Sequence, residues 1–182
     1  MPGLRPYDLA AWALEAAPVV LALPILWTTH RRFPLTGLIY VCIFLYGVVL
    51  AFGGAYAGAQ FAEFLDLGRN PYDGIGHVLQ GFVLALVVRE ILIRGQFVRG
   101  EGMRAFLVLC IVLALAVAYE LVKWSAALAL GHGAPAGAQA NMLCVLAGAL
   151  AALMLFSRLH DRQLKRLDRV SRDLEVAPRY AR

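Results

Sequence analysis

The segment "AFLVLCIVLALAVAYELVKWSAA", residues 105–127, is an unbroken apolar run that contains only two charged side chains, Glu120 and Lys123. A helix of about 20 mostly apolar residues crosses the hydrocarbon core of a bilayer. A backbone in lipid must satisfy its own hydrogen bonds, which only helices and closed barrels achieve. Because this run is continuous and does not alternate like a barrel strand, it predicts a membrane-spanning helix.

Four further apolar runs place the whole chain in the same class. The sequence is 61% hydrophobic and only 16% charged, whereas soluble domains carry about 25% charged residues. We therefore predict an all-α integral membrane protein, a bundle of about five transmembrane helices. The predicted spans are about Leu9–Thr28, Leu35–Ala57, Gly74–Ile93, Ala105–Ala127 and Asn141–Phe156.

Segments rich in glycine and proline separate these runs, and no linker divides two composition regimes. Residues 1–160 are thus predicted to form one transmembrane domain, followed by a basic helical tail over residues 157–182. The tail carries i, i+4 charge pairs such as Asp161/Lys165 beside an apolar stripe. It is expected either to lie on anionic lipid headgroups or to dock a partner protein.

The distribution of lysine and arginine predicts the orientation in the membrane. Thirteen of these residues fall on the side that holds Arg31, Arg99 and the tail, and only Arg5 and Arg69 fall on the other side. By the positive-inside rule the N-terminus lies outside and the C-terminus in the cytoplasm. The net charge of +5 then follows from topology, and no nucleic-acid partner is expected.

A polar stripe interrupts the third span in "RNPYDGIGHVLQGF", residues 69–82, where Asp73, His77 and Gln80 share one helix face. The other unusual polar residues also fall toward the outer side, apart from Arg89 and Glu90. We expect Arg89 to extend toward water at the cytoplasmic boundary. The predicted outward-facing pocket is lined by Glu15, Asp73, His77, Gln80, Glu120, Lys123, Gln139 and Asn141.

The chemistry of this predicted pocket stays open at the level of the sequence. His77, Asp73 and Glu120 are the catalytic candidates, with His77 as acid or base and Asp73 orienting it. No nucleophile motif accompanies them. The pairs Asp73–His77 and Glu120–Lys123 could instead be interior contacts that only fix the packing of the helices. No metal site is predicted, because no paired-histidine motif is present and Lys123 would compete with a cation beside Glu120. The pattern indicates no particular cofactor.

A ridge of small residues on the second span predicts a close-packing face. It includes a G-x-x-x-G spacing and consists of Gly47, Ala51, Gly54 and Gly58. Such ridges let helix backbones approach closely, either within a bundle or toward a partner membrane protein.

Read together, the segments at residues 14–54, "RNPYDGIGHVLQGF", "REILIR" and "YEL" resemble the YjdF-like family of bacterial inner-membrane proteins. The resemblance covers roughly residues 12–160 and is most specific at "RRFPL" and "NPYDGIGH". It implies a helical bundle in the bacterial inner membrane. The family is similar in turn to VanZ-like proteins, whose association with glycopeptide resistance suggests envelope or lipid-linked substrates.

The chain departs from the family pattern around the predicted pocket. Gly74 stands where the resemblance implies an arginine, and Lys123 stands where it often implies an acid. Because these changes neutralise part of the polar ring, we favour a non-catalytic accessory subunit or lipid-binding component that packs against a partner membrane protein. The alternative is an outward-facing enzyme that acts on a lipid-linked envelope substrate through His77 and Asp73.

Overall fold

The computed structural model describes residues 9–52, 71–129, 131 and 137–176, and all regular structure within these ranges is helical. The elements are α1 (Leu9–Thr29), α2 (Gly37–Phe52), α4 (Pro71–Arg94), α5 (Glu101–Ala129), α6 (Ala138–Ala151), the π-helical turn η2 (Ala152–Phe156) and α7 (Ser157–Val176). This confirms the all-α prediction.

Three helical stretches are long and apolar enough to cross a bilayer: Asp73–Arg94, Glu101–Ala129 and Ala138–Val170. Two shorter apolar helices, Ala17–Thr29 and Gly37–Leu50, coincide with the first two predicted spans. The positions of all five expected spans therefore correspond to apolar helices, while the number that crosses the membrane stays a prediction.

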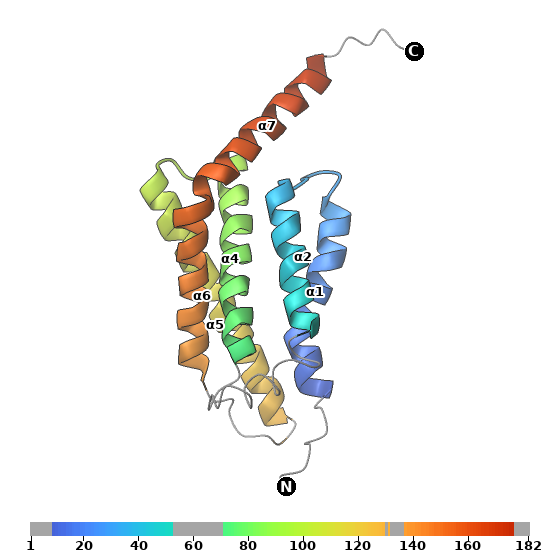
Figure 1. Cartoon of the computed structure of the whole chain (residues 1–182), viewed down its shortest axis with the longest axis vertical. Coiled ribbons are helices and arrows are strands. Elements are labelled where there is room, and N and C mark those ends of the chain that lie inside the picture. The colour runs from blue at the N-terminus through green and yellow to red at the C-terminus, as the bar shows by residue number, and fades with distance from the viewer. Residues whose placement is uncertain (1–8, 53–70, 130, 132–136, 177–182) are drawn as a thin grey trace.

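Helix α4 lies at the centre of the bundle and packs against α2, α5 and α6. Figure 1 shows it in green between α6 and α2. Its middle residues Ala85 and Leu86 are fully buried. The polar residues His77, Gln80 and Glu90 of α4 consequently sit inside the bundle, shielded by the neighbouring helices.

The surface of the bundle is more apolar than that of a soluble protein. Large apolar residues on α1 and α5, such as Trp27 and Phe106, are more than half exposed. The buried polar residues are Thr36, His77, Gln80, Arg89, Glu90, Asn141 and His160. Since ionisable groups are costly in hydrocarbon and face the interior of membrane bundles, this pattern fits a protein surrounded by lipid.

Two glycines bring α4 and α6 into backbone contact. A Cβ atom added to Gly81 would lie 1.9 Å from the Val145 carbonyl oxygen, and one added to Gly148 would lie 1.9 Å from the Val78 carbonyl oxygen. No side chain fits at either position, and both contacts are reciprocal across the same interface. The helix pair therefore depends on glycine, as small-residue interfaces in membranes do.

The structure describes one end of the ridge predicted on the second span. Gly47 lies in ordinary contact with Val19, since an added Cβ would be 3.5 Å from the Val19 Cγ1 atom. This contact joins α2 to α1 within the bundle. Gly54 and Gly58 lie outside the described residues, as does the side chain of Ala51.

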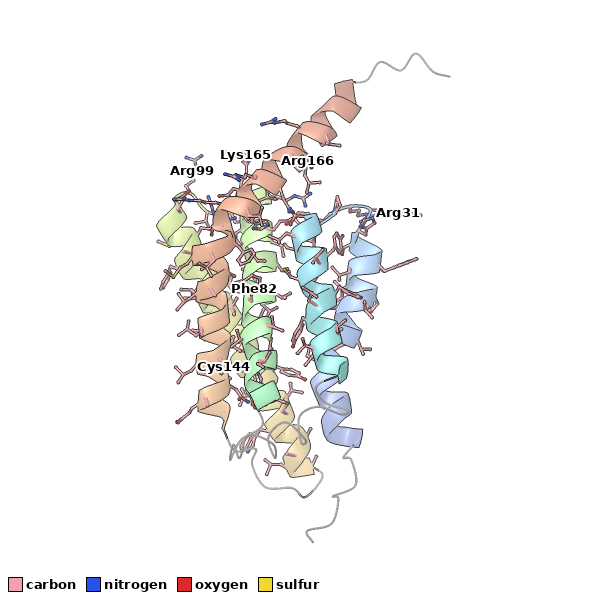
Figure 2. All side chains as sticks on the ribbon, viewed as in Figure 1. Arg31, Phe82, Arg99, Cys144, Lys165 and Arg166 are labelled. Atoms are coloured by element: carbon pink, nitrogen blue, oxygen red, sulfur yellow. The ribbon has the colours of Figure 1, made fainter. Side chains whose placement is uncertain are left out.

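One end of the bundle, here called the basic end, carries the loop between α1 and α2, the loop between α4 and α5, and α7. Figure 2 shows Arg31, Arg99, Lys165 and Arg166 gathered there. The first turns of α7 are part of the core, because Leu164 is only 4% exposed. Beyond them α7 projects away from the other helices (Figure 1).

We predict that Gly148→Ala destabilises the protein by about 1–3 kcal/mol, because the added methyl group forces α4 and α6 apart. The matched control is Gly102→Ala on α5, where an added Cβ meets nothing within 4 Å. That substitution should be neutral or slightly stabilising, since alanine favours helix over glycine. Thermal unfolding in detergent measures both, and equal melting temperatures for the two variants would contradict the glycine interface.

Candidate functional site

At the end of the bundle opposite the basic end, three helices contribute to one polar group, here called the His77 cluster. It consists of Asp73, His77 and Gln80 on α4, Glu120 and Lys123 on α5, and Asn141 on α6. His77 is buried and Glu120 is partly buried, each with a side chain only 11% exposed, whereas the Asp73 side chain is 37% exposed. The cluster is therefore accessible from outside the bundle at Asp73, whereas His77 and Glu120 lie deeper between the helices.

Both ring nitrogens of His77 face neighbours within the chain. Nδ1 lies 3.0 Å from Gln80 Oε1. Nε2 lies 3.4 Å from Asp73 Oδ1 and 3.9 Å from Glu120 Oε1. Both ring nitrogens therefore face oxygen atoms of amide or carboxylate groups within the chain, and such oxygens accept hydrogen bonds. Neither nitrogen is left with a lone pair directed at a substrate.

The Glu120 carboxylate is the shared acceptor of the cluster. Its Oε1 accepts hydrogen bonds from Lys123 Nζ on the same helix and, at 3.3 Å, from Asn141 Nδ2 on α6. Lys123 also lies over the Tyr119 ring, 5.5 Å from its centroid. The positive charge of Lys123 thus balances that of Glu120 inside the bundle.

Of the two remaining predicted pocket residues, Gln139 does not join these contacts. Gln139 lies exposed in the first turn of α6, and the side chain of Glu15 is outside the described residues. Ser125, one turn beyond Glu120, donates its hydroxyl hydrogen to the Leu121 carbonyl oxygen. Its hydroxyl is therefore engaged with its own helix backbone.

Among the residues that the structure describes, no group of three His, Cys, Asp or Glu side chains is arranged to hold a metal ion. Lys123 also donates to the Glu120 oxygen that is nearest to His77. A cation at this oxygen would have to displace the ammonium group.

A second polar group at the basic end escaped the sequence analysis. This Glu90 cluster consists of Thr36, Arg89, Glu90, Arg94, His160 and Asp161. Glu90 and His160 are completely buried. About 20 Å of helix separates Glu90 from His77, given a rise of 1.5 Å per residue over α4.

The Glu90 carboxylate is surrounded by donors. The Thr36 backbone N–H donates to both its oxygens at 3.1 and 3.2 Å, and Arg94 Nη1 donates to Oε1 at 3.0 Å. His160 Nε2 lies 3.0 Å from Oε2. Because α2 begins at Gly37, Glu90 supplies an acceptor and a negative charge at the start of that helix.

Arg89 does not extend toward water as expected, and its residue is only 5% exposed. Its Nη1 lies 3.1 Å from His160 Nδ1, and its Nη2 donates to Asp161 Oδ1 at 2.8 Å. Since arginine only donates, His160 Nδ1 accepts, and Nε2 carries the hydrogen that it gives to Glu90. Asp161 is thus paired with Arg89 on another helix, where the sequence predicts Lys165 as its partner.

The "RRFPL" motif lies in the loop between α1 and α2 and covers the Glu90 cluster through contacts with Arg94. Arg94 Nη1 donates to the Pro34 carbonyl oxygen at 2.5 Å, and its guanidinium carbon lies 3.8 Å from the centre of the Phe33 ring. A nearby side chain completes the attachment of α2, because Gln163 Oε1 on α7 accepts from the Leu38 N–H at 2.9 Å. The cluster ties α2, α4 and α7 together.

We predict that Lys123→Met alone destabilises the protein by about 3 kcal/mol, because it leaves the Glu120 charge buried without its cation. The double variant Lys123→Met with Glu120→Gln should recover most of that loss, since no ionised group then lacks a partner. Thermal unfolding of the two single variants and the double variant measures the coupling. If the stability losses of the two single variants simply add in the double variant, Glu120 and Lys123 do not form a charge pair.

Comparison with known proteins was made on the whole chain. The family model described as a predicted membrane protein (DUF2238) matches residues 1–162. The chain is 45% identical over 179 residues to the inner membrane protein YjdF of Escherichia coli (strain K12), covering 90% of this chain and 86% of that protein. This confirms the expected likeness to the YjdF-like family, while the likeness to VanZ-like proteins stays a prediction. No solved structure matches the chain.

Proposed function

The chain belongs to the DUF2238 family of membrane proteins and lies in the bacterial inner membrane, and from this premise we propose that it is a non-catalytic component that binds a lipid headgroup at the His77 cluster. The observation that carries the proposal is the engagement of both His77 ring nitrogens by Gln80 and the two carboxylates. A general base needs a free lone pair within reach of its substrate.

The exposed part of the cluster suggests which headgroup chemistry it takes. Asp73 is its most accessible acid, with a side chain 37% exposed, whereas Glu120 is already neutralised by Lys123. A partly exposed carboxylate at the end of a bundle accepts hydrogen bonds from ammonium or hydroxyl groups. The proposed ligand is thus a lipid whose headgroup offers such donors.

The proposal takes the basic end as cytoplasmic, in line with the positive-inside rule. Arg31, Arg99 and Lys165 all lie at that end (Figure 2). The His77 cluster, at the other end of α4, would then meet lipids of the outer leaflet.

The competing hypothesis is an enzyme in which His77 acts on a lipid-linked substrate with Asp73 as its orienting group. Asp73 lies near enough for that role, at 3.4 Å from Nε2. However, the same nitrogen would have to leave both carboxylates before it could accept a proton. Ser125, the hydroxyl-bearing residue of α5 near the cluster, is held by its own backbone.

We predict that Asp73→Asn lowers retention of phosphatidylethanolamine about tenfold, because one charge-assisted hydrogen bond to the ammonium group is lost. Native mass spectrometry of the full chain, released from nanodiscs that contain phosphatidylethanolamine and phosphatidylcholine, counts the retained lipid. Ser125→Ala is the control, since it changes an exposed polar residue of α5 outside the cluster. Equal retention by the two variants would reject headgroup binding here.

The accessory role rests on the outward surface of α5, which carries exposed apolar residues such as Leu115, Leu121 and Trp124. If this surface packs against a partner membrane protein, extraction in mild detergent should yield the chain in a larger complex of fixed stoichiometry. Leu121→Arg should release it, whereas Ile25→Arg on the exposed face of α1 should not. Recovery of the wild-type chain as a monomer alone would argue against the accessory role.

A further inference from the structure

A cavity of about 380 Å³ opens at the basic end, where α4 ends, α5 begins and η2 passes into α7. Three arginines line it, namely Arg89, Arg104 and Arg158. It lies on the side of α4 that faces α5 and α7. The His77 cluster lies at the other end of the bundle, so the cavity is a separate site.

The charges around the cavity leave an excess of one cation. Asp161 is balanced by Arg89, whose Nη2 donates to it at 2.8 Å. The other carboxylate in the lining is Glu101, at the exposed start of α5. The remaining cations in the lining are Arg104 and Arg158. A single anionic group would neutralise the cavity.

Arg104 also holds a donor that no neighbour satisfies. Its Nε atom is buried and has no hydrogen-bond partner among the residues described. A buried donor without an acceptor is costly to maintain, more so when the group is charged. An anionic oxygen in the cavity would meet this requirement.

The opposite wall of the cavity is apolar and continues onto the outside of the bundle. Leu153 and Met154, both in the π-helical turn η2, form part of the lining. Met154 is 79% exposed, so it extends from the cavity to the surface that faces acyl chains. Ser157 follows at the start of α7, beside the arginines. π-Helical turns occur often at functional sites, since they interrupt regular helix geometry.

We infer that this cavity binds a phosphate group, with a phospholipid of the leaflet at the basic end as its source. Planar guanidinium groups match phosphate oxygens in pairs. Arg89 forms a fixed part of the cavity wall, because its Nη atoms are already engaged by His160 and Asp161. Arg104 and Arg158 complete the cationic wall. The glycerol group and acyl chains of the bound lipid extend from the cavity along Leu153 and Met154. The inference is independent of the proposed function, because it concerns other residues at the far end of α4.

The test uses the full chain in phosphatidylcholine nanodiscs that contain a small fraction of phosphatidylglycerol, with retained lipid counted by native mass spectrometry. Arg104→Gln and Arg158→Gln should each lower phosphatidylglycerol retention about tenfold, the loss of one charge-assisted hydrogen bond. The matched control is Arg99→Gln, which removes the same charge from an exposed loop residue outside the cavity. It should retain the lipid like the wild type.

Two further measurements complete the test: the Arg158 variant by itself and competition by inorganic phosphate. Because Arg158 is exposed, its variant carries the test even if Arg104→Gln does not fold. Addition of millimolar inorganic phosphate that displaces phosphatidylglycerol from the wild type would identify soluble phosphate as a competing source for the same site. Failure to displace it would assign the site to the lipid. Equal phosphatidylglycerol retention by Arg158→Gln and Arg99→Gln would overturn the inference.

Discussion

The backbone contact between α4 and α6 is the constraint on which the rest of the structure depends. Gly81 and Gly148 each face a carbonyl oxygen of the other helix at a distance that excludes any side chain. With lipid outside, no hydrophobic force drives two apolar helices together, so close backbone packing supplies the attraction. This packing sets α4 at the centre of the bundle. Only a central helix could keep His77 and Glu90, at its two ends, away from lipid.

The segments that resemble the YjdF-like family correspond to these two ends. "NPYDGIGH" and "YEL" provide Asp73, His77 and Glu120 for the His77 cluster, whereas "RRFPL" and "REILIR" meet at the Glu90 cluster. The second cluster has an evident structural task. It caps the start of α2, encloses Arg94 between Phe33 and Pro34, and attaches α7 to the bundle. The first cluster instead presents a partly exposed carboxylate, Asp73, at the end of the bundle, which is why it is the better candidate for ligand binding.

The two ends also differ in the charge that they present. At the His77 cluster the accessible group is the carboxylate of Asp73, beneath which Lys123 and Glu120 balance each other. At the basic end the accessible groups are arginines beside an apolar wall. A bundle with an acidic opening at one end and a cationic cavity at the other can address different lipid headgroups in the two leaflets. Such a division agrees with the proposed role of a component that binds lipid headgroups.

The sequence by itself determined the fold class, the positions of the apolar helices and the polar stripe of α4, because length, hydropathy and helical periodicity act locally along the chain. It could also place Glu120 with Lys123, since i, i+3 neighbours meet on any helix. Only the tertiary structure decided that Arg89 turns inward to His160 and Asp161, residues more than 70 positions away. It likewise decided that Gly81 and Gly148 bring the backbones of α4 and α6 into contact. Neither result has a local signal: both depend on which faces of distant helices meet, and that is set by packing across the whole bundle.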